Sequence, residues 1–404
     1  MESRHYIFGG VTILVIVVSF FFFYRQWMPN SVQPVPVETT ETTSVPVPLK
    51  GEVVLGAVMP LTGDGSAYGL PIMRSIELAV DEVNGSGGID GRKVVVRYED
   101  GECDGPAAKR AATKLITVDG VEAILGGVCS SEVLGMAEMA NASKTVLLSP
   151  SATSPSISEQ GGDYTFRLVP SDAFASVVAA RFAFNDLHIR RIAVFAERTE
   201  YAQGLKNGFI NGFNSEGGEV ALEGGWDTGT TDFRNAAMKI KEAGIDAVYL
   251  LPQAPAAGLD FLQALQDAHV RVRILTNEVM LGREVAASHP GLLEGVYGFE
   301  AFYNETGDSA SKFLSMYESR EHEKAPFPFY MANAYSSIYL LKDLIEEQGN
   351  DGTRLRTAFL ALKHWKGGAL NDLTFTDQGD ILWSTYQVKL VRGGEITEDK
   401  LVTY

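Results

Sequence analysis

The fold is decided by residues 121–153, with the sequence VEAILGGVCSSEVLGMAEMANASKTVLLSPSAT. Two apolar runs in this stretch, residues 121–125 and 145–148, are typical of strands buried on both faces of a parallel sheet. The residues between them, 133–142, have the apolar spacing of a helix. A strand, a helix and a second strand in this order place the two following loops side by side at the carboxyl edge of one sheet, where open α/β sheets bind ligands.

Those two loops, residues 126–131 and 149–153, offer hydroxyl and backbone N–H groups and carry no charged side chain. The first loop also leads into the N-terminus of the expected helix, whose free N–H groups attract an anion. Such a surface suits a small carboxylate that is held without an arginine. For a single serine such as Ser131, the alternative is a helix cap that binds no ligand.

Strands and helices alternate along most of the chain. Strand-like runs occur at residues 53–58, 94–97, 123–125, 146–148, 192–195, 247–251 and 273–275. Helical patterns occur at residues 73–83, 107–116, 174–186, 205–213, 233–243 and 330–347. This order predicts an α/β fold with parallel sheets covered by helices on both faces. A chain of 404 residues is long enough for two lobes of this kind.

Composition and motifs argue against several classes of function. The formal net charge of −17 argues against a nucleic-acid partner, whose backbone needs a basic surface. The chain has no G-x-S-x-G segment and no phosphate-binding G-x-x-x-x-G-K-[ST] segment, and His322-Glu323 lacks the second histidine of a zinc helix. We therefore expect no catalytic residues, no metal ion and no cofactor, so an enzyme is the weaker hypothesis.

An apolar run of eighteen residues, 7–24, lies near the N-terminus between Arg4 and Arg25. A membrane-spanning helix needs about 17–25 residues. The run ends in phenylalanines without the small residues of a cleavage site, and no nearby cysteine could take a lipid. We therefore expect residues 1–28 to be a retained membrane anchor rather than a cleaved signal peptide, and the Pro/Thr-rich residues 29–50 to be a linker.

Several further segments, together with the two hydroxyl-rich loops, resemble a known family. They are Pro60-Leu61-Thr62-Gly63, Ala67-Tyr68-Gly69, residues 84–89, residues 100–104 and Glu200-Tyr201-Ala202-Gln203-Gly204. In combination they resemble the leucine/isoleucine/valine-binding proteins, which are the type I periplasmic solute-binding proteins of branched-chain amino acid ABC transporters. The resemblance covers roughly residues 51–404.

The resemblance implies an α/β fold with two Rossmann-like lobes, whose parallel sheets are joined by three hinge crossings. It assigns residues 51–171 and 302–384 to the first lobe, and residues 172–301 and 385–404 to the second. It also implies an extracytoplasmic protein that captures an amino acid, branched-chain or similar, by closure of its lobes and delivers it to an ABC transporter permease. The anchor would hold this domain at the cell membrane.

The resemblance implies roles for the polar residues of the site. Ser130 and Thr153 would give hydroxyl groups to the α-carboxylate of the ligand, and Ser151 would give backbone groups. Glu278, which follows a strand-like run of the second lobe, would bind the α-ammonium group. Without the resemblance, a single glutamate in a loop is more often simply solvated.

Aromatic residues and one glutamine are expected to surround the ligand side chain. By resemblance, Tyr68 and Tyr201 approach it from opposite lobes, with Phe329 or Tyr330 as an apolar neighbour, and the alternative is ordinary loop packing. Where the family tends to have an aromatic residue after a second-lobe strand, this chain has Gln253. We therefore expect a pocket that is more polar, or differently shaped, than a strictly aliphatic one.

The two cysteines of the chain, Cys103 and Cys129, are expected to form a disulfide. Their number is even, an exported protein meets an oxidising compartment, and both positions match the family. The alternative is a pair of free buried thiols.

Two other functions stay open beside amino acid capture. The same fold could serve as the ligand-binding module of a sensor or receptor, although only six residues precede the apolar run to hold any output. The pocket could also bind a related small amide or carboxylate in place of an amino acid.

Overall fold

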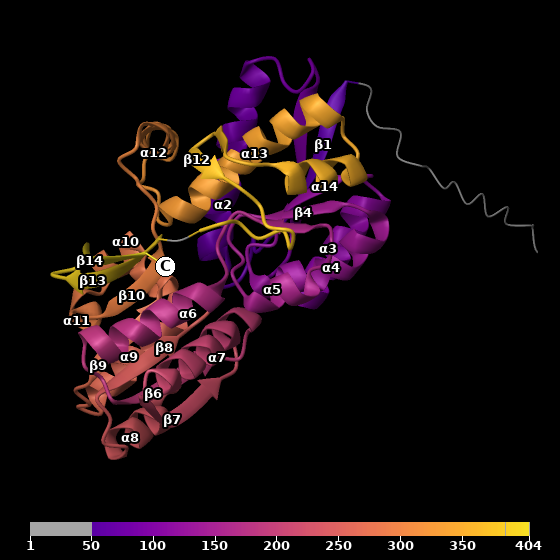
Figure 1. Cartoon of the computed structure of the whole chain (residues 1–404). Helices are drawn as coiled ribbons and strands as arrows, with labels where there is room; N and C mark the ends of the chain where they lie inside the picture. Colours follow the sequence, from indigo (N-terminus) through magenta and orange to yellow (C-terminus); the bar gives the residue numbers. More distant parts are fainter. Residues whose placement is uncertain (1–50, 384, 404) are drawn as a thin grey trace, which may run out of the picture. The chain divides into compact units, whose positions relative to one another are not determined.

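The structure is a computed structural model that describes residues 51–383 and 385–403. These residues form two large β-sheets with helices on their faces (Figure 1). The expected anchor, residues 1–28, and the expected linker, residues 29–50, lie outside the described part. Within that part, no helix is both long enough and apolar enough to span a membrane.

The first sheet has five parallel strands in the order β2-β1-β3-β4-β5. Their bounds are β1 Glu52–Met59, β2 Lys93–Asp100, β3 Ala123–Gly126, β4 Val146–Ser149 and β5 Thr165–Arg167. The helices between them are α2 Ser66–Gly85, α3 Gly105–Thr117, α4 Ser130–Ser143 and α5 Pro155–Gln160. Helix α2 packs on one face of this sheet and α3 and α4 on the other, so every residue of β3 and β4 is buried.

The second sheet has seven strands in the order β14-β13-β10-β9-β8-β6-β7. Its parallel strands are β6 Arg191–Glu197, β7 Glu219–Trp226, β8 Ala247–Leu251, β9 Arg273–Asn277 and β10 Tyr297–Ala301. Two antiparallel strands extend one edge, β13 Thr385–Arg392 and β14 Glu395–Thr403. The helices of this part are α6 Asp172–Arg181, α7 Glu200–Ser215, α8 Arg234–Glu242, α9 Pro255–Asp267, α10 Arg283–Ser288 and α11 Pro290–Leu293.

The chain crosses between the two sheets three times. It passes from β5 to β6, returns after β10, and crosses again to reach β13. The returning segment contains α12 Asp308–Glu321, α13 Pro328–Gln348, α14 Gly352–Ala361 and the short strands β11 Trp365–Gly367 and β12 Leu370–Leu373. It belongs with the first sheet, because α13 packs against α2 and α14 packs against β4. The predicted α/β fold with two lobes and three crossings is confirmed, while the residue boundaries of the lobes stay a prediction.

Each strand-like run found in the sequence overlaps an observed strand, and each helical pattern overlaps an observed helix. Helix 174–186 is α6 followed by one π-helical turn, Phe182–Asp186. Strand β7 was not predicted, because Gly224 and Gly225 interrupt its pattern and weaken a strand.

Candidate ligand-binding site

One pocket, of about 40 Å³, brings together all the residues that were predicted to bind a ligand. Those residues are Tyr68, Ser130, Ser151, Thr153, Tyr201, Gln253 and Glu278. They come from segments that follow strands β1, β3 and β4 of the first sheet and β6, β8 and β9 of the second. Tyr330 also lines the pocket, whereas Phe329, the other predicted apolar neighbour, is not part of its lining.

A buried carboxylate, Glu132, holds the first hydroxyl-rich loop in place. Its Oε2 atom accepts hydrogen bonds from the backbone N–H groups of Val128 (2.9 Å) and Cys129 (3.0 Å), and its Oε1 atom accepts one from Cys103 (3.1 Å). Burial raises the pKa of Glu132 to about 7, against the lowering effect of these three donors. The loop that presents Ser130 is therefore fixed through its backbone.

Two glycines let the same loop pass close to its neighbours. Gly126 has a φ of +115°, and a Cβ atom at this position would collide with the carbonyl oxygen of Val58. A Cβ atom on Gly127 would collide with the Cβ atom of Glu132. A larger residue at either position would therefore displace the loop that carries Ser130.

In the structure Cys103 and Cys129 form a disulfide, with Cα atoms 5.3 Å apart. The bond joins the turn after β2 to the residue that precedes helix α4. Ser131 reinforces this link, because its Oγ atom donates a hydrogen bond of 2.8 Å to Cys103 O. Cys129, not Ser131, occupies the N-cap position of α4, so the interpretation of Ser131 as a helix cap is wrong.

Serine hydroxyls bind the two hydroxyl-rich loops to each other. Ser149 Oγ donates a hydrogen bond to Gly127 O (2.7 Å) and accepts one from the N–H group of Ala152 (2.9 Å). Ser151 Oγ donates to Val128 O (2.9 Å). The hydroxyl proton of Ser151 is thus used inside the protein, and its backbone N–H group donates to Ser149 Oγ at 3.3 Å. The role of Ser151 toward a ligand stays a prediction.

Arg167, at the end of β5, anchors the second loop without lining the pocket, and it was not predicted from the sequence. Its side chain is buried, and its Nη1 atom donates to Ser154 O (2.9 Å). Its Nη2 atom donates to Ser158 Oγ (2.7 Å), and its Nε atom donates to Asp380 Oδ1 (2.6 Å). The guanidinium group thus ties the loop to a segment near the end of the chain.

Thr153 is paired with a buried carboxylate, Asp172, that was also not predicted. Thr153 Oγ1 donates a hydrogen bond of 2.7 Å to Asp172 Oδ2. With its proton directed at Asp172, the hydroxyl can only accept a hydrogen bond from a ligand. The predicted donation from this hydroxyl to a carboxylate does not fit that contact. The available signal was Ser171-Asp172, a pair typical of a helix start, which says nothing of a ligand.

Glu278 begins a short turn after β9, Glu278–Leu281. Its Oε1 atom accepts hydrogen bonds from the hydroxyl groups of Tyr201 (2.7 Å) and Tyr330 (2.8 Å), and no other described residue donates to Oε2. Burial raises the pKa of Glu278, and burial together with the charge of Glu278 raises the pKa of Asp172. The described residues that line the pocket include no lysine, arginine or histidine to offset these charges.

Gln253 is held by its backbone, while its side chain has only a weak partner. Its N–H group donates to Glu197 Oε2 (2.8 Å), and Glu197 Oε1 accepts from Thr228 Oγ1 (2.6 Å). Its side-chain Nε2 atom lies 4.0 Å from Cys129 Sγ, and a sulfur atom is a weak acceptor. The amide group of Gln253 is therefore available to a ligand.

Tyr68, on helix α2, lines the pocket and has a buried hydroxyl group. Its ring stacks on Phe327, with ring centroids 3.9 Å apart and an angle of 21° between the planes. Among the described residues its buried hydroxyl oxygen has no hydrogen-bond partner. Burial raises the pKa of this hydroxyl well above its usual value, so it stays a neutral donor.

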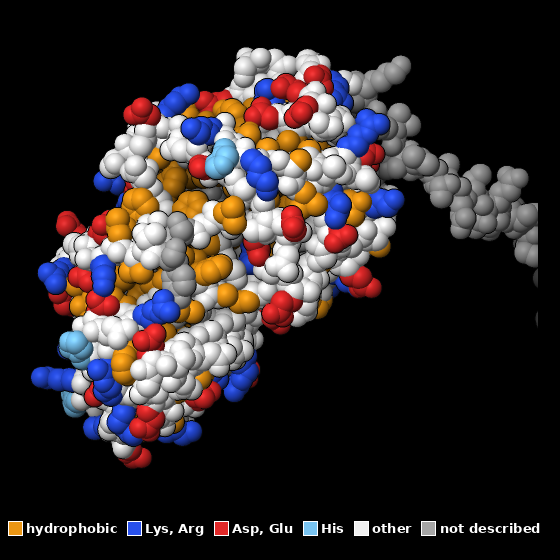
Figure 2. Space-filling view, viewed as in Figure 1, with side chains coloured by type: hydrophobic (Ala, Val, Ile, Leu, Met, Phe, Trp, Pro, Cys, Tyr) orange, Lys and Arg blue, Asp and Glu red, His pale blue; other side chains and the backbone are white. Residues whose placement is uncertain are grey.

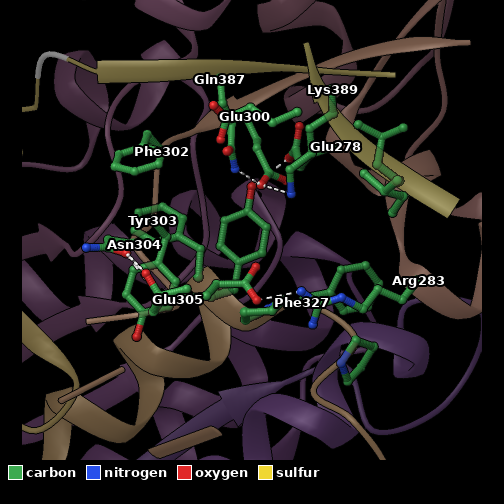
Figure 3. A pocket seen from close by; sticks show the side chains of 18 of the residues that line it. Glu278, Arg283, Glu300, Phe302, Tyr303, Asn304, Glu305, Phe327, Gln387 and Lys389 are labelled. Carbon is green, nitrogen blue, oxygen red and sulfur yellow. Dashed lines mark hydrogen bonds and ion pairs between the residues drawn. The ribbon is translucent and has the colours of Figure 1, made fainter. Parts of the chain in front are cut away.

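A larger cavity, of about 550 Å³, adjoins the pocket, and Glu278 and Tyr330 line both. The aromatic residues that Figure 3 labels in its wall are Phe302, Tyr303 and Phe327. Phe329 lines this cavity as well. The cavity therefore begins where the pocket ends, on the other side of the Glu278–Tyr330 contact.

Two cations in the wall of the larger cavity are paired within the protein. Arg283 forms an ion pair with Glu305, and Lys389 forms one with Glu300, which also accepts a hydrogen bond from Gln387 (Figure 3). On the face of the molecule in Figure 2, charged side chains of both signs are scattered and hydrophobic side chains gather toward the middle.

Comparison with known families identifies the class of protein. A sequence model described as periplasmic binding protein matches residues 52–394. The chain therefore belongs to the periplasmic binding protein family. Members of this family bind solutes and do not catalyse a reaction.

Relatives with curated descriptions are similar along most of the chain. The Leu/Ile/Val-binding protein homolog 1 of Brucella abortus is 26% identical over 330 residues, which are 81% of this chain and 87% of that protein. A Leu/Ile/Val-binding protein of Rhizobium johnstonii is 26% identical over 349 residues, which are 85% and 93% of the two chains.

Solved structures share the fold at lower sequence identity. A leucine-binding protein from Thermotoga maritima has a TM-score of 0.79 and 23% identity, over 87% of this chain and 99% of that one. A branched-chain amino acid binding protein from Streptococcus pneumoniae in complex with isoleucine has a TM-score of 0.79 and 22% identity, over 87% and 100%. A solute-binding protein from Rhodopseudomonas palustris in complex with benzoate has a TM-score of 0.78 and 18% identity, over 87% and 97%.

Proposed function

We propose that this protein is an extracytoplasmic substrate-binding protein that captures an amino acid between its lobes for an ABC transporter. The observation that carries the proposal is the distribution of charge around the pocket. Glu278, with Asp172 near it, approaches from the second sheet, and the N-terminus of helix α4 approaches from the first. An amino acid is a zwitterion, so it complements both groups at once.

Three hydrogen-bond donors of the first lobe suit the carboxylate end of the ligand. Ser130 Oγ accepts a hydrogen bond from the N–H group of Ser154 (3.2 Å), which leaves its own proton for a ligand. The backbone N–H groups of Ser130 and Thr153 have no acceptor among the described residues. The dipole of helix α4 adds a favourable potential for an anion at this point. We therefore assign the ligand carboxylate to these donors.

Two acceptors suit the ammonium end. The Oε2 atom of Glu278 receives no hydrogen bond from another described residue, and Thr153 Oγ1 offers only lone pairs to the pocket. The raised pKa values of Glu278 and Asp172 support this assignment, because a bound ammonium group would stabilise both ionised carboxylates. We therefore assign the hydroxyl of Thr153 to the ammonium group of the ligand, and not to the carboxylate as the resemblance implied.

Ligand binding and lobe closure are coupled in this proposal. The first lobe holds the carboxylate and the second lobe, through Glu278, holds the ammonium group, so the ligand binds fully only when the lobes are together. A ligand that interacts better with the closed form shifts the population toward that form. The closed form is then the one that an ABC transporter permease receives.

The names of similar proteins support an amino acid as the ligand. They also suggest the main alternative ligand, a carboxylate without an ammonium group. The curated relatives are Leu/Ile/Val-binding proteins, and solved structures of the fold hold isoleucine or leucine. Others hold benzoate or 3,4-dihydroxybenzoic acid, which have a carboxyl group and no ammonium group. A related carboxylate or amide is therefore the second candidate, and Glu278 is the residue that separates the two.

A thermal-shift screen of the purified full-length chain with the twenty amino acids tests the ligand class. A ligand that binds only the folded state raises the midpoint of unfolding. Calorimetry then compares the best amino acid with its des-amino analogue. Tighter binding of the amino acid supports the proposal, whereas tighter binding of the analogue favours the carboxylate rival. Loss of uptake of that amino acid in cells without the protein separates transport from a sensor function.

We also propose that residues 1–28 stay attached as a membrane anchor, with residues 29–50 as a tether. At about 3.1 Å per residue, an extended linker of this length reaches ~70 Å from the membrane. Membrane fractions should yield a single peptide that contains both Tyr24 and Met28. A mature chain that begins within residues 25–50 would overturn this part of the proposal.

A further inference from the structure

The polar groups of the pocket are not all used by the ammonium and carboxylate ends of an amino acid. Tyr68 and Gln253 line the same pocket, together with the apolar residues Val128, Ala152 and Val279. Neither of these two polar side chains has a role in the charge pairing described above. The hydrogen bonds that Tyr68 and Gln253 lack within the protein therefore indicate which group the ligand side chain carries.

The hydroxyl group of Tyr68 is the clearest case of a polar group without a hydrogen-bond partner. The residue is 8% exposed, and the oxygen of its hydroxyl group has no partner among the described residues. The stacking of its ring on Phe327 fixes the direction of the side chain. Buried polar groups are almost always hydrogen-bonded, so the buried hydroxyl of a residue that lines a ligand pocket points to a partner on the ligand.

The side-chain amide of Gln253 is a second polar group that lacks hydrogen-bond partners. A carboxamide can donate two hydrogen bonds and accept two. In the described part of the chain the only hydrogen-bond partner of the Gln253 side chain is Cys129 Sγ, 4.0 Å from Nε2. The backbone N–H group of Gln253 donates to Glu197 Oε2, and its side chain lines the pocket.

The cations in the wall of the larger cavity already have partners within the protein. These two cations, Arg283 and Lys389, form ion pairs with Glu305 and Glu300 (Figure 3). The hydroxyl of Tyr303 in the same wall donates to a backbone oxygen at 3.3 Å. Tyr68 and Gln253 line the small pocket and are not part of the lining of the larger cavity.

We propose that Tyr68 and Gln253 bind a neutral hydrogen-bonding group on the ligand side chain, a hydroxyl or a carboxamide. The group is neutral because the lining has no cation for an anionic side chain, and its one carboxylate, Glu278, is taken by the ammonium group. The inference rests on the proposed function and narrows it. The preferred ligands are small polar amino acids such as threonine and asparagine, rather than leucine, isoleucine or valine.

Two pairs of amino acids with matched shape test this inference by calorimetry on the full-length protein. Valine replaces the hydroxyl of threonine by a methyl group, and leucine has the branched shape of asparagine without its amide. A site built to hydrogen-bond a ligand group rejects the analogue that lacks it. We expect the polar member of at least one pair to bind at least ~10-fold more tightly, which is about 1.4 kcal/mol.

Variants assign the preference to the two residues. Tyr68→Phe and Gln253→Met keep the size of each side chain, and each should reduce the polar preference about tenfold. Tyr303→Phe, in the larger cavity, is the matched control and should leave it unchanged. The thermal unfolding midpoint of each variant shows whether it is folded, and the wild-type panel decides the central point without any variant.

The outcomes separate this inference from the proposed function. Tight binding of valine or leucine, at or above the affinity of threonine and asparagine, overturns the inference and leaves the amino acid binder intact. A polar preference that survives both Tyr68→Phe and Gln253→Met overturns the assignment to these residues. Absence of binding by every amino acid overturns the proposed function and the inference with it.

Discussion

Thr153 and Asp172 are joined by two hydrogen bonds, one of 2.7 Å from Thr153 Oγ1 to Asp172 Oδ2 and one of 2.9 Å from the N–H group of Asp172 to Thr153 O. Thr153 belongs to a ligand loop of the first sheet. Asp172 is the first residue of α6, the first helix after the chain leaves that sheet. The pair therefore connects the pocket directly to a crossing between the lobes.

Replacement of Thr153 by alanine should weaken amino acid binding at least ~10-fold. The substitution removes an acceptor for the ligand ammonium group, and a hydrogen bond to a charged group is worth about 1.5–3 kcal/mol. Calorimetry on the full-length chain measures the change. Thr357→Ala, an exposed threonine on α14 whose hydroxyl bonds to its own helix, is the control. Equal affinities for both variants and wild type would show that Thr153 does not bind the ammonium group.

Reduction of the disulfide should destabilise the protein. Cys103 and Cys129 are 26 residues apart, and a loop of this size contributes about 3 kcal/mol in the chain-entropy model. Peptide mass spectrometry without reduction should find the linked pair in exported protein, and a reductant should lower the unfolding midpoint. Two cysteines that react with an alkylating agent in native protein would contradict the linkage.

The stability of the protein should fall as pH rises from about 4.5 to 7 because of Glu132. Its folded-state pKa is about 7, above the ordinary value near 4.3, so in this window the folded chain holds a proton that the unfolded chain releases. The stabilisation is complete below the lower pKa and is lost above pH 7. At 1.36 kcal/mol per unit, the change is about 3 kcal/mol.

Urea unfolding at pH 5 and pH 8 isolates this effect when wild type is compared with Glu132→Gln, which cannot titrate. The wild type should lose more stability than the variant between the two pH values. Glu138→Gln is the control on the same helix, since the Glu138 side chain is 82% exposed. Identical pH profiles for wild type and Glu132→Gln would show that the buried carboxylate does not take up the proton.

Arg167→Met should destabilise the first lobe by about 3 kcal/mol. The change keeps an unbranched apolar stem but removes the guanidinium group, so it leaves Asp380 and the oxygen of Ser154 without their buried donor. Denaturant unfolding measures the loss. The matched substitution Arg234→Met removes an exposed pair with Asp232 and should change stability by no more than about 0.5 kcal/mol. Similar effects of the two substitutions would contradict the anchoring role of Arg167.

The parts of the site that depend on local pattern could be predicted from the sequence. Residues 126–131 and 149–153 each follow a short apolar strand, and the carboxyl ends of parallel strands meet at one edge of a sheet, so their proximity followed from order alone. Glu278 and Tyr201 came from the resemblance, and the structure brings them within 2.7 Å of each other. Their roles toward a ligand stay predictions.

The residues that support the site could not be predicted, because their partners are distant in the sequence. Arg167 bonds to Asp380, which is 213 residues away, and no local pattern connects the two. Asp172 has the sequence of an ordinary helix start, and its importance comes only from the hydroxyl of Thr153, 19 residues earlier. Ser131 shows the opposite error, because a helix start suggested a cap, whereas its hydroxyl donates a hydrogen bond to Cys103 O, 28 residues earlier.

The effect of Glu278→Gln on the affinity for an amino acid tests the central claim most directly. The substitution keeps the size of the side chain and removes its charge. Loss of one partner of a buried charge pair costs about 2–5 kcal/mol, so the best amino acid of the screen should bind at least ~30-fold more weakly. Its des-amino analogue should lose little or gain affinity, and Glu398→Gln, at the exposed edge of the larger cavity, should change neither. An amino acid affinity that is the same in wild type and Glu278→Gln would contradict the account.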